Sequence, residues 1–304
     1  MKIVLITGAL GQDGIILSKI FLKKKFKVFG IIRKKKKKIV PKVKYILNNL
    51  KSKEKIDKIL KKVKPSIIIH LAATNNSYSF KNKENFKNNY LLNLIYTKNL
   101  INSAVEINSL KKFIFAGSSL MFKNQKKITV TEKSNFGSKD YYSKYKIDSF
   151  KYLQKKSKIY DFDSTTVLLF NHDSVYRNKK FLIPRLVKAF IRKDKNLIEK
   201  IFSFNISGDF SHAEDICNGI FSLSTSNKKI PKIILSSGKR FYINDIINYL
   251  AKIFSIEIKK KSILKKTNYK HLGSNNLAKK LIKFKNEKTI FEVVDQMIQK
   301  KTKD

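Results

Sequence analysis

Short apolar runs alternate with longer amphipathic stretches through the first half of the chain. The short runs are bounded by charged or turn-forming residues, which is the pattern of buried strands. We expect strands over residues 2–6, 27–32, 43–47, 66–71, 112–116 and 164–170. Between them apolar residues recur at helical spacing, and we expect helices over residues 13–24, 53–63, 85–107 and 141–155. This alternation predicts a parallel sheet with helices on both faces.

The second half of the chain, after Asn171, is less regular. Helical spacing there predicts helices over residues 184–193, 213–224, 243–254 and 290–300. No stretch rich in Pro, Gly and Ser separates the two halves, so we expect them to share one core. The predicted fold class is α/β. We expect a Rossmann-type, doubly wound parallel sheet over residues 1–170 and a smaller, mixed α/β portion over residues 171–304.

The composition is strongly basic, which bears on possible partners. The 67 Lys and Arg residues against 22 Asp and Glu residues give a formal net charge of +45. Such a balance can indicate nucleic-acid binding. The lysines, however, are spread along the whole chain among Ile, Asn, Phe and Tyr residues, which indicates a bias at solvated positions. We therefore expect neither a nucleic-acid nor a membrane partner, and a positive field that favours anionic ligands.

Other residue types narrow the class further. Cys217 is the only cysteine, which excludes an internal disulfide and a thiolate zinc site. The four histidines are too scattered to predict a metal site, and His70 and His212 are expected to be structural. The apolar runs are too short to cross a bilayer, and the first residues lack the pattern of a signal peptide. We expect a cytoplasmic protein.

A glycine-rich segment follows the first predicted strand and opens the first predicted helix. It reads Thr7-Gly8-Ala9-Leu10-Gly11-Gln12-Asp13-Gly14. Glycines at such a turn let the backbone approach a pyrophosphate closely, and the helix N-terminus offers unpaired N–H groups. The strand–turn–helix context predicts a dinucleotide site.

The end of the second predicted strand indicates which dinucleotide is bound. NAD enzymes of this fold place an acidic residue there, which hydrogen-bonds the ribose hydroxyls. Here the strand ends Ile32-Arg33-Lys34, without an acid. Because a cation suits the 2′-phosphate, the sequence favours NADP over NAD, with Arg33 as the phosphate ligand. The lysines at positions 35–38 are expected to be solvated.

A Tyr-x-x-x-Lys pair, Tyr142 and Lys146, stands at the start of the helix predicted over residues 141–155. The spacing puts both side chains on one helix face, where the ammonium is expected to lower the pKa of the phenol. Tyr142 would then exchange a proton with a substrate hydroxyl. Ser118 follows the strand predicted over residues 112–116 and is expected to hydrogen-bond the same oxygen. These three residues are the predicted hydride-transfer site.

Several segments together resemble a known family. Besides the glycine-rich segment they are His70-Leu71-Ala72-Ala73, Phe170-Asn171-His172-Asp173-Ser174 followed by Arg177, and Gly208-Asp209-Phe210-Ser211-His212. In these segments the sequence resembles the extended short-chain dehydrogenase/reductases, also called the NAD-dependent epimerase/dehydratase family. Within that family it is most similar to the GDP-mannose 4,6-dehydratases, over nearly the whole chain.

The resemblance implies an NADP-binding domain over residues 1–170 and a substrate-binding portion over residues 171–304. The implied cofactor contacts are Gly8, Gly11, Gln12, Asp13, Gly14, Arg33, Asn49, Leu50, Leu71, Ala72, Ala73, Lys146, His172 and Arg177. The implied substrate contacts are Ser119, Asn171 and Arg185. The substrate would be a nucleotide-diphosphate sugar, GDP-linked, and the protein a homodimer or tetramer that serves deoxysugar or polysaccharide synthesis.

Two departures from the dehydratase pattern leave the reaction open. Leu120 stands where the dehydratases have the glutamate that drives water elimination across C5 and C6 of the sugar. Gly208 replaces an arginine expected to hold the diphosphate, and Lys239, Arg240, Lys265 or Lys266 would have to compensate. The sequence is therefore compatible with a dehydratase-like enzyme and with a 4-epimerase or 4-keto-reductase that lacks elimination. A regulatory nucleotide binder without turnover is a further alternative.

Overall fold

The computed structural model describes residues 2–34, 40–74, 83–123, 129–258, 268–269 and 271–301. The lysines expected to be solvated at positions 35–38 lie outside these ranges, as do Lys265 and Lys266. None of the helices in the described ranges is both long and apolar enough to cross a membrane.

A seven-stranded sheet forms the centre of the molecule, and every neighbouring pair of its strands is parallel. The order across the sheet is β3–β2–β1–β4–β5–β7–β11. These strands are β1 (Ile3–Thr7), β2 (Lys27–Ile32), β3 (Lys44–Leu47), β4 (Ile67–His70), β5 (Lys112–Ala116), β7 (Asp163–Leu169) and β11 (Lys232–Leu235). The order reverses between β1 and β4, and such a switch point leaves a crevice at the carboxyl ends of the two strands.

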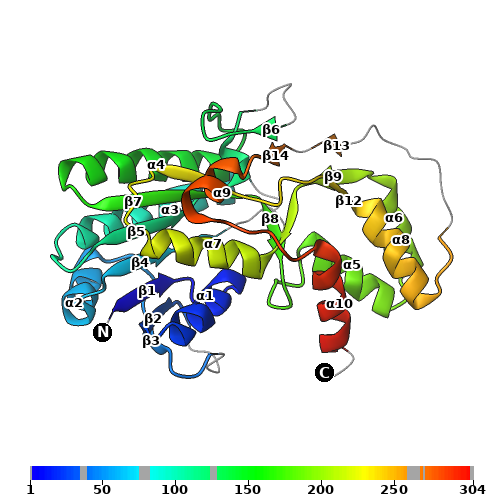
Figure 1. Cartoon of the computed structure of the whole chain (residues 1–304), viewed down its shortest axis with the longest axis horizontal. Helices are drawn as coiled ribbons and strands as arrows, with labels where there is room; N and C mark the ends of the chain where they lie inside the picture. Colours follow the sequence, from blue (N-terminus) through cyan, green and yellow to red (C-terminus); the bar gives the residue numbers. More distant parts are fainter. Residues whose placement is uncertain are drawn as a thin grey trace.

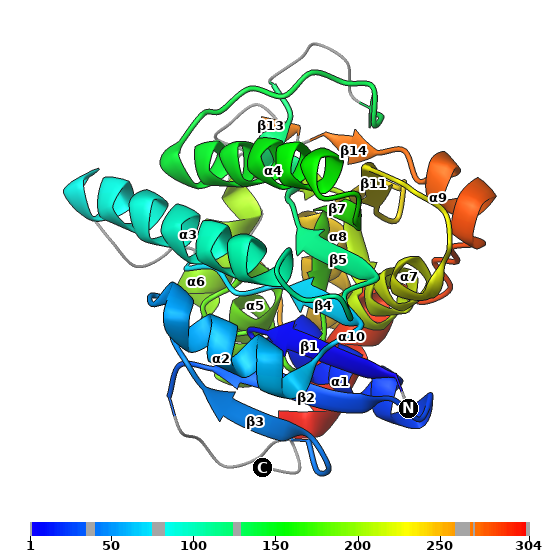
Figure 2. The same ribbon diagram turned by 90° about the vertical axis from the view of Figure 1, so that its left-hand side faces the viewer.

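Helices cover both faces of this sheet (Figure 2). On one face lie α2 (Lys53–Val63), α3 (Lys83–Ala104) and α4 (Tyr141–Ile159). On the other lie α1 (Gln12–Lys23) and α7 (Ala213–Thr225). Side chains alternate between the two faces: Leu5 and Ile68 join the core under α2, α3 and α4, while Val4 and Ile69 join the core under α1 and α7. Both faces are buried, and the strands are therefore continuously apolar.

The second half adds a helical cluster at one end of the sheet (Figure 1). Its helices are α5 (Leu182–Ile191), α6 (Lys195–Ser203), α8 (Ile243–Phe254) and α10 (Ile290–Lys301). They pack around an apolar core of their own, in which Phe190, Ile247 and Val294 are fully buried. The two halves are nevertheless joined, because α7 packs on α1 and β11 pairs with β7. The predicted division at residue 170 therefore cuts the sheet, because the edge strand β11 comes from the second half of the chain.

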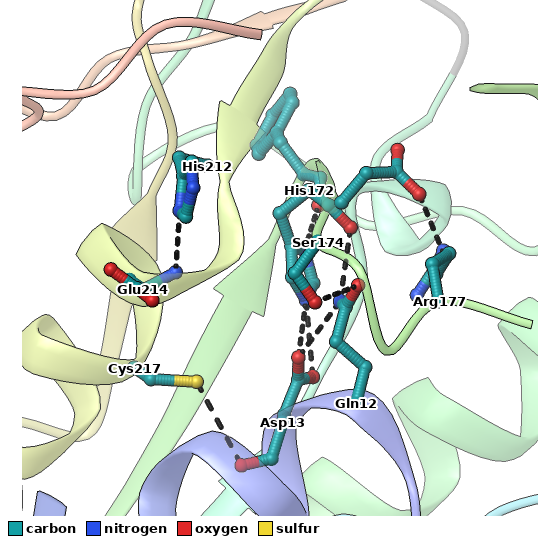
Figure 3. Close-up of polar contacts among 10 residues, drawn as sticks. Gln12, Asp13, His172, Ser174, Arg177, His212, Glu214 and Cys217 are labelled. Carbon is teal, nitrogen blue, oxygen red and sulfur yellow. Dashed lines mark hydrogen bonds and ion pairs between the residues drawn. The ribbon is translucent and has the colours of Figure 1, made fainter. Parts of the chain in front are cut away.

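Short elements complete the described chain. They are η1 (Ser119–Met121), β6 (Thr129–Val130), β8 (Asn171–Asp173), β9 (Ile206–Gly208), β10 (Phe210–His212), β12 (Phe241–Tyr242), β13 (Asn268–Tyr269), β14 (Leu272–Gly273) and α9 (Asn276–Ile282). β8 pairs with β10, β9 lies between β12 and β13, and β14 pairs with β6. β8 and β10 bring the second half next to the start of α1 (Figure 3).

The predicted doubly wound parallel sheet is confirmed, and all six expected strands are present. Some helix ends differ from the prediction. α3 ends at Ala104, after which the chain makes a tighter turn, in which the N–H of Ile107 bonds the carbonyl of Ala104 three residues back. α4 continues to Ile159, and the lysines of its last turn suit the negative end of the helix dipole.

Candidate functional site

A cavity of about 630 Å³ opens at the carboxyl ends of β1, β2 and β4, where the strand order reverses. Many of the predicted cofactor residues line it, namely Gly8, Gly11, Arg33, Asn49, Leu50, Leu71, Ala72 and Ala73. The remaining predicted cofactor residues lie outside its lining, namely Gln12, Asp13, Gly14, Lys146, His172 and Arg177. The cavity therefore brings together predicted cofactor residues that follow the first four strands, β1 to β4.

Two glycines, one in the turn after β1 and one in the first turn of α1, have no room for a side chain. Gly8 has a φ of +71°, and a Cβ there would lie 3.1 Å from the backbone nitrogen of Ala72. A Cβ on Gly14 would lie 2.5 Å from the carbonyl oxygen of Gly8. α1 begins at Gln12, and its N-cap residue Gly11 has no side chain to occupy the first N–H groups. This open helix N-terminus behind a glycine cradle fits the pyrophosphate of a dinucleotide.

Cations line the part of the cavity that follows β2. Nη1 of Arg33 donates to Oγ1 of Thr74 at 3.3 Å, and Lys34 lines the cavity beside it. The lining that the structure describes contains no carboxylate. This donor set fits a ribose 2′-phosphate better than a free 2′-hydroxyl.

The side chains of Gln12 and Asp13 are directed toward β8 (Figure 3). The Asp13 carboxylate lies 3.0 and 3.1 Å from Nε2 of His172. Gln12 donates from Nε2 to the carbonyl of His172 at 3.1 Å and accepts from the Ser174 hydroxyl at 3.0 Å. These contacts fasten the start of α1 to β8.

Electrostatics stabilise the ionised form of this pair. Burial raises the pKa of the Asp13 carboxyl, but the charge and hydrogen bond of His172 outweigh burial and lower it to about 2. Burial lowers the pKa of His172, but the charge and hydrogen bond of Asp13 outweigh burial and raise it. His172 and Asp13 thus form a buried ion pair that joins the two halves of the chain.

Arg177 extends this cluster. Its Nε lies 3.1 Å from Oδ1 of Asp173, and its guanidinium carbon lies 3.7 Å from the ring centre of Phe181. The positive charge of Arg177 also acts to lower the pKa of both Asp13 and Tyr142. Arg177 therefore connects the His172 segment electrostatically with the predicted catalytic tyrosine.

Tyr142 and Lys146 lie in the first turns of α4. Asp140 caps this helix, because its carboxylate accepts from the N–H of Ser143 at 2.7 Å and the Ser143 hydroxyl bonds the Asp140 backbone in return. Lys146 is 2% exposed, and its ammonium donates to the carbonyl of Ala116 at 2.6 Å. Its Nζ lies 5.5 Å from the ring centre of Tyr142. The helix thus places the pair beside the end of β5, which Ser118 follows.

The expected effect of Lys146 on Tyr142 is wrong for this structure. Burial raises the pKa of the Tyr142 phenol to about 12, and the charge that opposes this shift comes from Arg177. Burial also lowers the pKa of Lys146 to about 7. The physical reason is that desolvation dominates for both groups, while the ammonium is directed to the Ala116 carbonyl. Tyr142 is therefore protonated at neutral pH.

The three residues of η1, all of which the structure describes, carry no carboxylate. The Ser118 hydroxyl accepts from the N–H of Leu120 at 3.2 Å, and Leu120 itself is 42% exposed. Glu132 accepts from the N–H of Ile234 at 2.9 Å and so serves as an anchor for β11. Ser119 lies partly exposed between Ser118 and Leu120.

The predicted substrate residues lie on three different elements, Ser119 in η1, Asn171 on β8 and Arg185 on α5. Asn171 donates from Nδ2 to the carbonyl of Asp209 at 3.1 Å, and Arg185 is exposed on α5. Gly208 pairs with Phe241, and the adjacent Arg240 donates from Nη1 to the Ser207 hydroxyl at 3.0 Å. Arg240 therefore lies beside the position from which the family's arginine is missing.

The sequence did not identify the contribution of α3. Asn93 and Tyr96 line the cavity, and Asn93 bonds both backbone groups of Thr74 at 2.9 and 3.0 Å. These contacts hold the segment after β4 in place. The sequence does place Asn93 on the buried face of an amphipathic helix. Burying its amide costs free energy unless the amide is hydrogen-bonded, and this could have indicated a specific contact. His212, expected to be structural, does cap α7 by accepting from the N–H of Glu214 at 3.1 Å.

Known proteins resemble the chain in sequence along most of its length. A GDP-6-deoxy-D-talose 4-dehydrogenase of Aggregatibacter actinomycetemcomitans is 27% identical over 216 residues, covering 68% of this chain and 69% of that protein. A GDP-mannose 4,6 dehydratase of Dictyostelium discoideum is 24% identical over 341 residues, covering 98% of this chain and 95% of that protein.

Solved structures share the fold. A UDP-glucose 4-epimerase of Thermotoga maritima, solved with UDP-glucose, superposes with a TM-score of 0.85 at 15% identity and covers 99% of this chain and 100% of that chain. A UDP-glucuronic acid 4-epimerase of Bacillus cereus, solved with NAD, has a TM-score of 0.81 at 18% identity, with 98% and 99% covered.

Fold and motifs together define an extended short-chain dehydrogenase/reductase, and the similar proteins named above are sugar-nucleotide enzymes of this class. The family model described as GDP-mannose 4,6 dehydratase matches residues 5–303. The chain belongs to the GDP-mannose 4,6 dehydratase family.

Proposed function

We propose that this protein is an NADP-dependent oxidoreductase that transfers hydride at C4 of a GDP-linked hexose without eliminating water. The observation that carries the proposal is Leu120. Ser118 caps the short helix η1, which continues with Ser119 and Leu120, and none of these three residues carries the carboxylate that elimination requires. The similarity to a 4-dehydrogenase of a GDP-6-deoxyhexose supports the same reaction class.

The protein's own groups suit the reductive direction. A nicotinamide cofactor in the glycine cradle would supply the hydride to the C4 carbonyl. The Tyr142 phenol would donate its proton to the C4 oxygen, because a pKa of about 12 keeps it protonated until a substrate oxygen becomes basic. The Ser118 hydroxyl would hold the same oxygen, and the Lys146 ammonium would bind the ribose and restore the tyrosine proton by way of solvent.

The cofactor proposal rests on the cavity lining. Arg33 and Lys34 would bind the 2′-phosphate of NADP, and the N-terminus of α1 would bind the pyrophosphate. Arg240 would bind the substrate diphosphate from its place beside Gly208. Asn171, Ser119 and Arg185 would complete the sugar-nucleotide site.

A dehydratase reaction is the second candidate, because the family model spans residues 5–303 and is described by that activity. It would require a carboxylate from elsewhere. Glu132 does not meet this need, since its side chain bonds the backbone of Ile234. A 4-epimerase needs only the hydride-transfer residues and is the remaining alternative.

The test offers the purified protein GDP-4-keto-6-deoxymannose with NADPH, and separately GDP-mannose with NADP⁺. The proposal predicts consumption of NADPH and a two-hydrogen gain by the keto sugar, with GDP-mannose unchanged in mass. Tyr142→Phe should lower the turnover number by about 10²–10⁴ because it removes the proton donor. Loss of water from GDP-mannose would establish the dehydratase reaction instead.

A further inference from the structure

A continuous chain of hydrogen bonds runs from α4 to the glycine-rich turn. The Tyr145 hydroxyl lies 3.2 Å from Oγ1 of Thr97 on α3, and this oxygen lies 2.9 Å from Nε2 of His70. Nδ1 of His70 lies 2.7 Å from Oγ1 of Thr7, which accepts from the N–H of Ala72 at 3.1 Å. The chain therefore joins α4, α3 and the carboxyl ends of β4 and β1.

Every side chain of this hydrogen-bond chain is buried. Tyr145 and Thr7 are 0% exposed, and Thr97 and His70 are 1% exposed. Burial, with a smaller effect of the Lys146 charge, lowers the pKa of His70 to about 3, so its imidazole is neutral. A neutral imidazole has one donor and one acceptor nitrogen, which matches one hydroxyl on each side. In a buried environment, breaking one of these hydrogen bonds leaves its donor or acceptor unsatisfied. The hydrogen-bond chain is therefore held rigidly in one arrangement.

Both ends of the chain lie at functional groups. Ala72 lines the cavity, and Thr7 directly precedes Gly8 in the crowded turn. At the other end, the ring centre of Tyr145 lies 5.0 Å from Nζ of Lys146 and 6.2 Å from the ring centre of Tyr142. Tyr145 also packs edge-on against Phe115 of β5, with ring centres 6.3 Å apart.

We propose that Tyr145, Thr97 and His70 are positioning residues, which set the distance between the Tyr142–Lys146 pair and the cofactor turn through one buried hydrogen-bond chain. The turnover readout of this proposal rests on the proposed function, whereas its binding readout does not. Tyr145 acts through Lys146 and Tyr142 and touches neither substrate nor cofactor in this role. A misplacement of the pair by a fraction of an ångström would slow hydride transfer, because the reacting groups must be held in a near-attack geometry.

The test compares two tyrosines of α4 that both bond to α3. Tyr145→Phe removes only the hydroxyl that enters the chain. Tyr152→Phe removes a hydroxyl that donates to Asn102 at 2.6 Å and has no part in the chain. We expect Tyr145→Phe to lower kcat about tenfold and to raise the Kd of NADPH about fivefold, measured by nicotinamide fluorescence without sugar. Tyr152→Phe should leave kcat and Kd within about twofold of the wild-type values. It should lower Tm by about as much as Tyr145→Phe does.

Variants of Thr97 test whether the residues act as one unit. Thr97→Ser keeps the hydroxyl and should retain wild-type kcat and Kd, whereas Thr97→Val should match Tyr145→Phe. The double variant of Tyr145→Phe and Thr97→Val should lose little more than either single change, because the chain is already broken. The proposal is overturned if Tyr145→Phe and Tyr152→Phe have equal kcat and equal NADPH affinity. If the wild type turns over none of the sugars tested, the proposed function fails. The NADPH affinities of the variants then test the positioning role by themselves.

Discussion

Leu120 is the residue that separates the proposed reaction from that of a dehydratase. It is 42% exposed, so a polar replacement should change stability by no more than about 0.5 kcal/mol. Leu120→Glu supplies a carboxylate in η1 beside Ser118 and Ser119. We expect this variant to acquire water elimination from GDP-mannose, with a rate about 10²-fold or more above that of the wild type. Mass spectrometry of the nucleotide sugar measures the loss.

The matched control for this change is Leu120→Gln, which has the same shape without an ionisable group. It should remain unable to eliminate water and should keep the 4-keto-reduction. Equal elimination by the Glu and Gln variants would show that the carboxylate at position 120 is not the deciding group.

Arg33 should determine the preference between the two nicotinamide dinucleotides. A charge-assisted hydrogen bond contributes about 1.5–3 kcal/mol. Arg33→Ala should therefore weaken NADPH binding about 10- to 100-fold and leave NADH binding nearly unchanged. Lys34→Ala, the neighbouring control, should have a smaller effect. Fluorescence titration with each cofactor measures the affinities, and an equal loss for both would contradict the assignment of Arg33 to the 2′-phosphate.

At the scale of elements, the contact between α1 and β8 depends on the Asp13–His172 ion pair. The pKa of Asp13 is lowered to about 2 in the fold, so its contribution is present above the unfolded value of 3.8 and is lost as the pH falls through about 2. The pKa of His172 is raised, so its contribution is complete below the unfolded value of 6.5 and is lost as the pH rises through the folded value. The pair is therefore strongest between about pH 4 and pH 6.5.

Asp13→Asn should lower the free energy of unfolding by about 2–4 kcal/mol at pH 5.5, because it leaves a buried His172 without its partner. The loss should be smaller at pH 8.5, because the stabilisation from the raised pKa of His172 declines once the pH exceeds the unfolded value of 6.5. Urea unfolding at both pH values measures the difference. A loss that is equal at the two pH values would mean that Asp13 acts there only as a hydrogen-bond acceptor. Lys53, whose ion pairs lie on the surface, offers the control Lys53→Met, which should change stability by less than about 1 kcal/mol.

The sequence predicted elements where one local pattern decided the structure. β1, the glycine turn after it and the start of α1 are each determined by residues adjacent in the sequence. The structure places Gly8 and Gly11 of this turn in the cavity lining. β8 was not predicted, because a three-residue strand has no periodicity and its pairing with β10 depends on distant residues. The direction of the Lys146 ammonium was missed for the same reason, since its acceptor at Ala116 is 30 residues away.

At the scale of the whole molecule, α3 exposes several apolar side chains. Leu91, Leu92 and Ile95 are 44%, 39% and 46% exposed on this helix. Exposed apolar side chains clustered on one helix are typical of interfaces. We expect a homodimer, and we expect Ile95→Glu to give a monomer at micromolar concentration, measured by sedimentation velocity.

The control for this prediction is Ile253→Glu. Ile253 is also 46% exposed and also lies on a helix, α8, in the second half of the chain. The Ile253→Glu variant should leave the dimer intact. If Ile95→Glu sediments like the wild type, α3 does not form the interface.

The most direct test of hydride transfer at C4 follows the transferred atom itself. NADPH deuterated at both C4 positions of the nicotinamide is incubated with GDP-4-keto-6-deoxymannose, and the product is analysed by NMR. We expect deuterium on C4 of the sugar, none on C5 or C6, and no water loss from GDP-mannose in a parallel incubation with NADP⁺. Deuterium absent from C4, or water lost from GDP-mannose by the wild-type protein, would contradict it.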